Sequence, residues 1–365
     1  MTATPDNGSD HPTPPVDRVK AGAFVEQLKA SYQSTMLTMM IDLGHRSGAL
    51  AAMRGAGPIN AVALAASSGQ SIRHLQEWLS AMAVAGVVDF DADSQTFTLP
   101  EEHAMWLTGA VATNLAPMAG MLMGLAQRTD DVVAAFDQGT GVPYERYRPH
   151  FTHAMDEIGR AKYDEMLVSM YLPKSSGLPE RLRSGIDVAD FGCGTGHCLN
   201  LMAEAFPESR FTGYDISVDA LHLAEFEAKT MGLSNVSFVT ADVATLANDP
   251  RFDVAFAFDA IHDQADPAGV LSIIRSSLRP GGELFMVDIK ASSYLADNLK
   301  DPMNLMLYGI SVMHCMEVSL AVGGAGLGTA WGTQLATSML HDAGFDEVTV
   351  HDIERDPSNC IYVCR

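Results

Sequence analysis

The sequence predicts an α/β protein in which a mainly helical domain precedes a domain built on a seven-stranded sheet. Residues 184–290 alternate short apolar segments with amphipathic ones, which is typical of buried parallel strands connected by helices. Residues 18–165 are helical in pattern, apart from one short stretch. A chain of 365 residues has room for two or three domains, each with its own core.

The N-terminal part has the order helix, turn, helix, hairpin, which is typical of a winged helix. A first helix extends over residues 19–44, and a helix-compatible stretch starts at Pro58. Ser71 can cap the next helix. The apolar face of that helix carries Ile72, Leu75, Leu79 and Met82. Residues 87–90 and 96–99 flank the turn DADSQ and predict a hairpin.

The charge of this winged helix argues against DNA binding. Residues 1–110 hold eleven acidic residues against six basic ones, and the whole chain has a formal charge of −22. Such acidity repels phosphate groups and anionic membranes. We therefore expect a packing and dimerisation module, with neither nucleic acid nor membrane as a partner.

Composition is that of a soluble globular protein, with 47% apolar and 19% charged residues. The five cysteines form no CxxC pair, which favours free thiols in a reducing cytosol over a zinc site, and we expect no metal. The N-terminus lacks the pattern of a signal peptide, and the apolar stretch from Leu115 is too short to span a bilayer. We expect a cytoplasmic protein.

Seven apolar segments predict the strands of the second domain. They are residues 186–191, 210–215, 236–242, 252–258, 281–289, 346–353 and 359–365. The first is followed by a turn with Gly192, Gly194 and Gly196, where positive φ angles are permitted and a ligand can approach the backbone. The spacing is GxGxG and not the dinucleotide pattern GxGxxG, because the sixth position is His197.

Carboxylates follow several of these strands. Asp215 ends the second strand, Asp242 ends the third, and the fourth leads into the turn FDAIHDQADP at residues 258–267. Polar groups at the carboxyl ends of parallel strands either cap and solvate a turn or face a ligand.

In their order, these motifs resemble the class I S-adenosylmethionine-dependent methyltransferases, whose Rossmann-like sheet has an antiparallel last strand. The whole chain is similar to two-domain small-molecule O-methyltransferases with an N-terminal winged-helix dimerisation domain. The resemblance implies a homodimer that uses S-adenosylmethionine (SAM) and methylates a small molecule, with a hydroxyl oxygen favoured. The expected parts are a disordered tail (1–17), a winged-helix domain (18–110), a helical linker and pocket segment (111–183) and a SAM-binding domain (184–365) with a lid insertion at about 291–335.

The resemblance also implies roles for the strand-end residues. Asp215 would accept hydrogen bonds from both ribose hydroxyls, and Asp242 would accept one from the adenine amino group. Asp190 would lie near the ammonium group of the methionine tail. The expected SAM-binding residues are Asp190, Gly192, Cys193, Gly194, Gly196, Asp215, Ile216, Asp242, Val243, Phe258 and Asp259. Each aspartate can alternatively be a plain helix or turn cap.

Two segments rich in aromatic residues and methionine, residues 142–167 and 304–332, fall outside the predicted sheet. In the resembling enzymes such segments close the acceptor pocket, although methionine and aromatic residues also fill ordinary cores. The candidate pocket residues are Tyr144, Tyr147, Met155, Tyr308, His314 and Trp331.

The turn after the fourth strand resembles the HDWSDE-like turn of plant-type O-methyltransferases, in which the histidine is the general base. Carried over, His262 is that base, and an imidazole titrates near neutrality. Gln264 stands where the family has tryptophan. Asp288 matches the first of two glutamates that orient the family's histidine, whereas Glu317 has no clear match to the second. In the alternative interpretation, His262 only caps the strand.

Two other functions remain open on the same motifs. One is a non-enzymatic winged-helix regulator that senses a ligand through a methyltransferase-like domain. The other is an enzyme that uses SAM on this scaffold for hydroxylation or decarboxylation.

Overall fold

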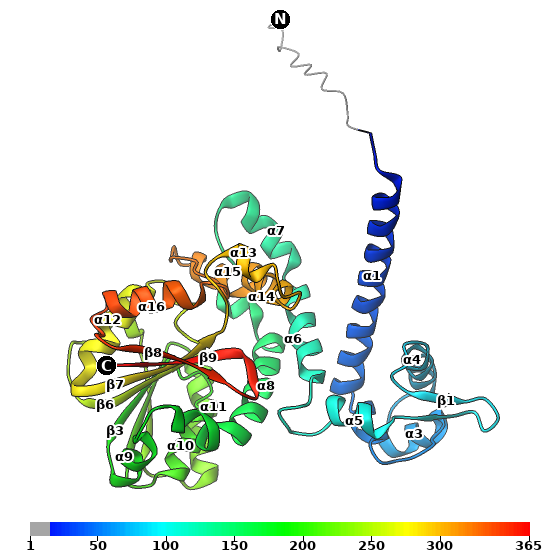
Figure 1. The fold of residues 1–365 in the computed structure, drawn as a ribbon. Coiled ribbons are helices and arrows are strands. Elements are labelled where there is room, and N and C mark those ends of the chain that lie inside the picture. Colours follow the sequence, from blue (N-terminus) through cyan, green and yellow to red (C-terminus); the bar gives the residue numbers. More distant parts are fainter. Residues whose placement is uncertain (1–14) are drawn as a thin grey trace, which may run out of the picture. The chain divides into compact units, whose positions relative to one another are not determined.

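The computed structural model describes residues 15–365, and the chain divides into two units that meet between Ala104 and Met105 (Figure 1). Residues 1–14 of the expected disordered tail lie outside the described residues. Asp17, the last residue of that expected tail, instead caps the first helix. Its carboxylate accepts hydrogen bonds from the backbone N–H groups of Val19 and Lys20 at 3.0 and 3.1 Å.

The first unit has the predicted winged-helix order. Its elements are α1 (Arg18–Arg46), α2 (Ala49–Met53), α3 (Ala61–Ser68), α4 (Ile72–Val84), β1 (Asp89–Asp91) and β2 (Thr96–Thr98), followed by α5 (Glu101–Leu107) at the boundary. Leu75, Leu79 and Met82 of the predicted apolar face of α4 are buried, whereas Ile72 in its first turn is exposed. Trp78 of the same helix is also buried, and its indole N–H donates to the carbonyl oxygen of Met40 at 2.8 Å.

The second unit begins with helices that precede its sheet. They are α6 (Ala116–Ala126), α7 (Thr129–Gln138), the 3-10 helix η1 (Tyr144–Tyr147), α8 (His150–Met166), the π-helix η2 (Leu167–Tyr171), the 3-10 helix η3 (Leu172–Lys174) and α9 (Leu178–Ser184). Of these helices, α8 contacts the turn that follows β3, where the candidate site lies.

The predicted seven-stranded sheet is confirmed. Its strands are β3 (Asp187–Phe191), β4 (Arg210–Asp215), β5 (Val236–Thr240), β6 (Phe252–Phe258), β7 (Leu278–Ile289), β8 (Val348–Ile353) and β9 (Asp356–Cys364). Their spatial order is β5-β4-β3-β6-β7-β9-β8, and β9 runs antiparallel to both of its neighbours. The chain moves outward from β3 to β5 and then returns to place β6 on the other side of β3. The carboxyl ends of β3 and β6 therefore form the switch point where ligands bind in such sheets.

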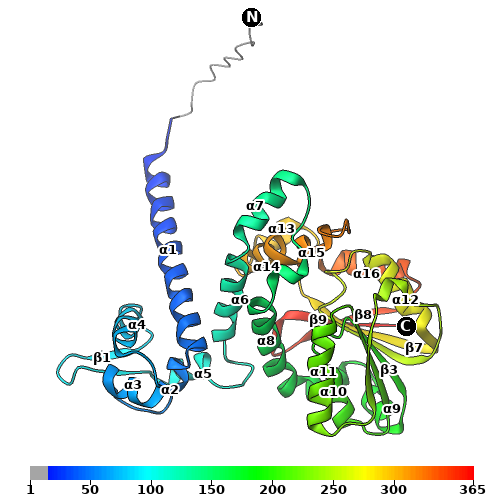
Figure 2. The same cartoon turned by 180° about the vertical axis from the view of Figure 1, so that it is seen from behind.

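Helices cover both faces of this sheet (Figure 2). Those that connect or follow the strands are α10 (His197–Ala205), α11 (Val218–Met231), the 3-10 helix η4 (Val243–Thr245), α12 (Pro267–Ser277) and α16 (Gly332–Asp342). Val254 and Phe256 of β6 pack into one core cluster, and Ala255 and Ala257 pack into another. This alternation explains why the strands are almost continuously apolar, because both faces are buried.

An insertion of short helices separates β7 from α16, within the expected lid segment. It contains α13 (Leu295–Asn298), α14 (Asn304–Ile310), the π-helix η5 (Ser311–Cys315) and α15 (Met316–Leu320). Among residues 15–365, no helix combines the length and the apolar character needed to cross a membrane.

Candidate active site

The three glycines of the turn after β3 have φ angles of +80°, +53° and +70°, but their surroundings differ. A Cβ atom on Gly196 would lie 2.5 Å from the side chain of Ala224, so this glycine permits close packing of α10 and α11. A Cβ atom on Gly194 would meet no atom of the described residues within 4 Å. The turn is therefore packed at Gly196 and open at Gly194.

Asp215, at the end of β4, is fixed against this open turn. One carboxylate oxygen accepts the backbone N–H of Gly194 at 2.8 Å, and the other accepts that of Ser217 at 2.8 Å. Burial raises the pKa of Asp215, and these hydrogen bonds oppose the rise. Cys193 also lies in the turn, and its backbone N–H donates to Tyr214 of β4 at 3.0 Å. Ile216, which follows Asp215, is exposed.

Asp190 of β3 is a buried carboxylate that forms no ion pair with any of the residues from 15 to 365. It is 1% exposed, and within the described part of the chain its Oδ1 atom has no hydrogen-bond partner. Burial, with a smaller contribution from the charge of Asp215, raises the pKa of Asp190 to about 7. Because two carboxylates disfavour each other's ionisation here, a cationic group that entered this site would be stabilised by both.

Asp242 and Val243 have different surroundings from those of the carboxylates Asp190 and Asp215. Asp242 is exposed and caps η4, with its carboxylate accepting the N–H of Ala244 at 3.0 Å. The side chain of Val243 is buried in the core. The contacts of Asp242 are those of a turn cap, and Asp266 likewise caps α12 by accepting the N–H of Gly269 at 2.9 Å.

Phe258 and Asp259, at the end of β6, contact α8 and β9. The ring of Phe258 lies edge-on to Tyr163, with 5.4 Å between the centroids. Asp259 has a φ of +48°, and its carboxylate accepts a hydrogen bond from Asn359 at 2.5 Å and lies 3.9 Å from Nζ of Lys162. Burial raises the pKa of Asp259 to about 6. These contacts hold the strand end in place.

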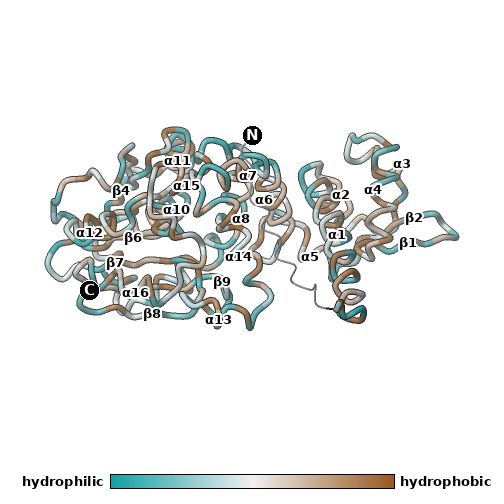
Figure 3. Tube along the Cα trace, turned by 90° about the horizontal axis from the view of Figure 1, so that it is seen from above, coloured by the Kyte–Doolittle hydropathy of each residue, from teal (hydrophilic) through white to brown (hydrophobic). Residues whose placement is uncertain are grey.

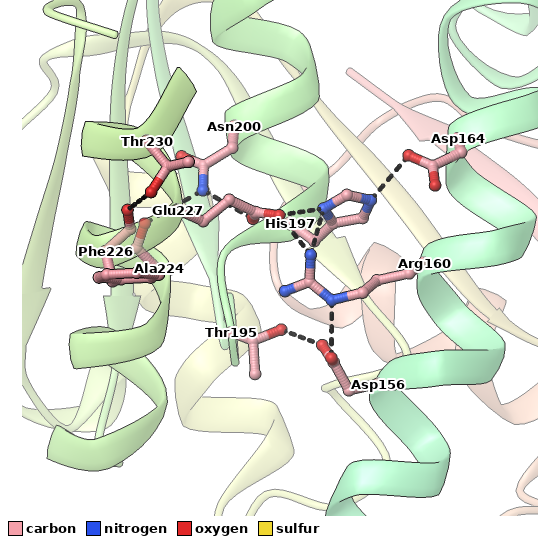
Figure 4. A network of polar contacts seen from close by, with 10 residues as sticks. All are labelled: Asp156, Arg160, Asp164, Thr195, His197, Asn200, Ala224, Phe226, Glu227 and Thr230. Atoms are coloured by element: carbon pink, nitrogen blue, oxygen red, sulfur yellow. Dashed lines mark hydrogen bonds and ion pairs between the residues drawn. The ribbon is translucent and has the colours of Figure 1, made fainter. Parts of the chain in front are cut away.

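A network of polar side chains connects the glycine turn to α8 (Figure 4). Thr195 donates to Asp156 at 2.5 Å, and Arg160 donates to the second oxygen of Asp156 at 2.7 Å. Arg160 also pairs with Glu227 of α11, and His197 lies 3.0 Å from Asp164. The sequence prediction missed this network. Its one local signal is the four-residue spacing of Asp156, Arg160 and Asp164, which places them on one face of α8.

His262 is almost fully buried, and its ring is held by Asp288. The exposed fraction of His262 is 3%, and its Nδ1 lies 2.8 Å from Oδ1 of Asp288. The same oxygen accepts the indole N–H of Trp331 at 3.1 Å. Because carboxylates are acceptors, Nδ1 carries the proton and Nε2 faces away from Asp288. Nε2 lies 3.4 Å from Oδ1 of Asp263.

The two carboxylates determine the protonation of His262. Burial alone would lower its pKa, but the charges of Asp288 and Asp263 raise the pKa well above the ordinary value of a histidine. A hydrogen bond with the Cys315 thiol acts in the same direction. The sequence prediction named Asp288 as a partner of His262 but gave no role to Cys315.

Three of the six predicted pocket residues come together. The ring of His314 lies 4.6 Å from that of Tyr147 and 6.1 Å from that of Tyr144, with Phe151 of α8 at 4.2 Å. Neither ring nitrogen of His314 has a hydrogen-bond partner among residues 15–365, and burial lowers its pKa to about 4. His314 is therefore a neutral ring in an aromatic cluster.

The other three candidate pocket residues have different surroundings. Met155 is exposed on α8. Tyr308 accepts a hydrogen bond from Asn298 at 2.9 Å within the insertion. Trp331 is 3% exposed and packs in a core cluster of the sheet domain, so its role as a pocket wall stays a prediction. Its indole N–H supports the partner of His262.

Comparison with known proteins identifies both parts of the chain. Residues 182–344 match a family described as a methyltransferase domain, and residues 35–109 match the Rv2258c-like winged helix-turn-helix domain. The chain is 31% identical over 106 residues to (S)-coclaurine N-methyltransferase of Papaver somniferum, which is 29% of this chain and 30% of that protein. The chain spans between 30% and 54% of the length of the first curated relatives it matches.

Solved structures share the architecture over nearly the whole chain. The mitomycin 7-O-methyltransferase MmcR has a TM-score of 0.69 at 17% identity, over 96% of this chain and 100% of that one. Human N-acetylserotonin methyltransferase, solved in complex with SAM, has a TM-score of 0.66 at 16% identity, over 97% and 99%. The chain therefore joins a region similar to the Rv2258c-like winged helix-turn-helix domain to a region similar to a methyltransferase domain, in a fold that it shares with these solved methyltransferases.

Proposed function

We propose that this protein transfers a methyl group from SAM to a small-molecule acceptor, and that the favoured accepting atom is a hydroxyl oxygen. The observation that carries this proposal is the pair of Asp190, with its unpartnered buried oxygen, and Asp215, which accepts the N–H of Gly194 in the open part of the glycine turn. The matches to methyltransferase domains and folds support the same reaction class.

The residues at the turn fit SAM. Asp190 would pair with the ammonium group of the methionine tail, since a buried carboxylate without a partner gains most from a cation. Asp215 would accept the ribose hydroxyls, because its two oxygens have more lone pairs than the backbone N–H groups of Gly194, Ile216 and Ser217 occupy. Gly194 leaves room for the ligand beside the backbone. When bound, SAM supplies an electrophilic methyl group on a sulfonium.

His262 would take the proton of the acceptor hydroxyl at Nε2. Its Nδ1–H donates to Asp288, which fixes the tautomer and stabilises the imidazolium that forms. The raised pKa makes His262 a stronger base than a free imidazole and also leaves less of it unprotonated at neutral pH. An alcohol or phenol needs this proton removal, so the presence of a supported histidine favours oxygen as the accepting atom.

The aromatic cluster of Tyr144, Tyr147, Phe151 and His314 supports a planar, mostly apolar acceptor. The ring centroids lie 4.2 to 6.1 Å apart; three of the rings are buried, and the exposed ring of Tyr144 offers an aromatic surface on which another ring can pack. The segment that bears His314 immediately precedes Cys315, whose thiol bonds to His262. One peptide bond, between His314 and Cys315, therefore joins the aromatic cluster to a residue that contacts the candidate base.

The test is a donor-dependent assay with a panel of planar hydroxylated compounds. S-adenosylhomocysteine should form together with a product heavier by one methylene group, and His262→Ala should keep SAM binding while losing product. A product that gains an oxygen or loses carbon dioxide would favour the hydroxylase or decarboxylase. Sequence-specific DNA binding at physiological salt without product formation would favour the regulator.

The protein also has an apolar stripe that suits a homodimer, and five unpaired cysteines that suit the cytoplasm. Hydrophobic residues are visible along α1 in Figure 3. The exposed members at helical spacing are Val25, Tyr32, Met36, Met39 and Leu43. Met36→Glu with Met39→Glu should give a monomer in sedimentation at micromolar concentration, whereas the control Gln33→Glu should remain a dimer. A wild-type monomer would contradict this assembly.

A further inference from the structure

Three side chains with metal-binding atoms converge beside the candidate base. They are His262 and Asp263, from the turn after β6, and Cys315, from the π-helix η5. One donor atom from each lies within 4.8 Å of the other two, and Nε2 of His262 lies 3.4 Å from Oδ1 of Asp263. Nitrogen, oxygen and sulfur donors from segments 52 or more residues apart thus point to one location.

This location is shielded, and one of its donors is unsatisfied. His262 is 3% and Cys315 5% exposed. Oδ1 of Asp263 is buried and makes no hydrogen bond with the residues that the structure describes. The nearest cationic group is Nε2 of His262, at 3.4 Å, and a buried carboxylate oxygen that makes no hydrogen bond is costly and points to a missing ligand.

The contacts at Nδ1 of His262 are those of a metal-ligating histidine. Its Nδ1–H donates to Asp288 at 2.8 Å, and Asp288 is itself held by the indole N–H of Trp331 and the backbone N–H of Ile289. A carboxylate on the outer nitrogen fixes the tautomer and leaves the other nitrogen as the ligand. Nε2 is the nitrogen that faces Asp263.

We propose that His262, Asp263 and Cys315 form a binding site for a thiophilic divalent cation, of which Zn²⁺ is the natural example. Imidazole and thiolate ligands favour Zn²⁺ over Mg²⁺ or Ca²⁺, which prefer oxygen. Three protein ligands leave a fourth tetrahedral position for water or another small ligand. The absence of a CxxC pair, which argued against zinc at the level of sequence, does not bear on a site with a single cysteine.

Binding exchanges protons for the cation. Bonds form from the cation to Nε2, to Sγ and to Oδ1, while the S–H bond of Cys315 and the Nε2–H bond of a protonated His262 break and release their protons to solvent. A site that begins with one positive and one negative charge thus binds a dication and loses two protons, so total charge is conserved. The cation then binds the lone pair of Nε2, which His262 needs to accept a proton as a base.

Methyl transfer should therefore be inhibited by the cation in a way that a chelator reverses. This consequence rests on the proposed function, because it needs His262 to be the base. Cation binding itself does not depend on the proposed function, and it is measured by titration with the metal alone, without any methyl acceptor.

The experiment titrates Co²⁺ into the reduced, metal-free full-length protein and follows thiolate-to-cobalt charge-transfer absorption. The wild type should give a saturable band with one cobalt per chain, which Zn²⁺ abolishes. Cys315→Ser should lose the band, and the control Cys364→Ser, a buried cysteine in β9, should keep it. Asp288→Asn should retain the band and weaken cobalt affinity by roughly 10–100-fold, because it alters the hydrogen bond to Nδ1 of His262 without removing a ligand.

Circular dichroism of each variant separates loss of the site from loss of folding, and Asp288→Asn provides a second reading if Cys315→Ser does not fold. A wild type without a saturable band, or a band that survives Cys315→Ser, overturns the metal site. A cobalt band together with a methyltransferase that Zn²⁺ leaves fully active upholds the site and refutes His262 as the base.

Discussion

Nδ1 of His262 lies 2.8 Å from Oδ1 of Asp288, although 26 residues separate them in the chain. The contact joins the turn after β6 to the end of β7, two neighbouring parallel strands. It orients one nitrogen of the histidine toward a carboxylate and leaves the other for chemistry.

His262→Ala should lower turnover by roughly 10²–10⁴-fold on a hydroxylated acceptor, because the proton then has no positioned base. Affinity for SAM, measured by calorimetric titration, should change no more than a few-fold, since His262 is not among the residues expected to bind the donor. Single-turnover formation of S-adenosylhomocysteine is the measurement. A variant as fast as the wild type would show that His262 is only a structural residue.

The rate should rise with pH above neutrality, because the base must be unprotonated and its pKa is raised despite its burial. Asp263→Asn removes one of the two charges that raise this pKa, so the rising limb should move to lower pH. The pH profile of kcat, recorded with a chelator present, checks the sign. A limb that moves to higher pH, or stays in place, contradicts the assigned coupling.

SAM affinity should increase as pH rises through about 7, the pKa to which burial and Asp215 raise Asp190. Only the ionised carboxylate pairs with the ammonium group, so binding releases a proton on the acidic side of that pKa. Asp190→Asn should weaken binding and abolish this pH dependence. Titrations in buffers of different ionisation enthalpy measure the proton release, and a pH-independent wild type would rule out the pairing.

Asp215→Ala should weaken SAM binding by about 1.5–3 kcal/mol, the cost of losing charge-assisted hydrogen bonds. Asp249→Ala, which alters an exposed carboxylate in a neighbouring loop, is the matched control and should bind SAM normally. Calorimetry on both folded variants makes the comparison. Equal affinities for the two would remove Asp215 from the donor site.

Gly194→Ala and Gly196→Ala should fail in different ways. A methyl group on Gly194 enters open space, so the cost in folding free energy is limited to the positive φ, about 1 kcal/mol, but SAM binding should be lost. A methyl group on Gly196 would collide with Ala224 and Phe238, so the variant should be strongly destabilised. Thermal unfolding and SAM titration separate the two. Equal destabilisation would contradict the open turn.

Much of the fold could be predicted because its signals are local. The strand segments, the glycine turn and the winged-helix order each follow from a few adjacent residues. The contacts of Cys315 and Trp331 could not be predicted, because they depend on how the insertion packs over the sheet. Cys315 is 53 residues from its partner His262, and Trp331 is 43 residues from its partner Asp288. A pattern rich in aromatic residues also does not reveal which ring lines a pocket and which, like Trp331, supports a carboxylate.

Helix α8 (His150–Met166) contacts three parts of the candidate site. Near its start Phe151 packs on His314, in its middle Asp156 and Arg160 hold the glycine turn, and farther along Tyr163 packs on Phe258. A helix behaves as a stiff rod over this length, so its two ends cannot adjust independently. We therefore expect the two substrates to affect each other's binding: SAM bound at the turn should raise the affinity for the acceptor, and the acceptor should raise the affinity for SAM by the same factor.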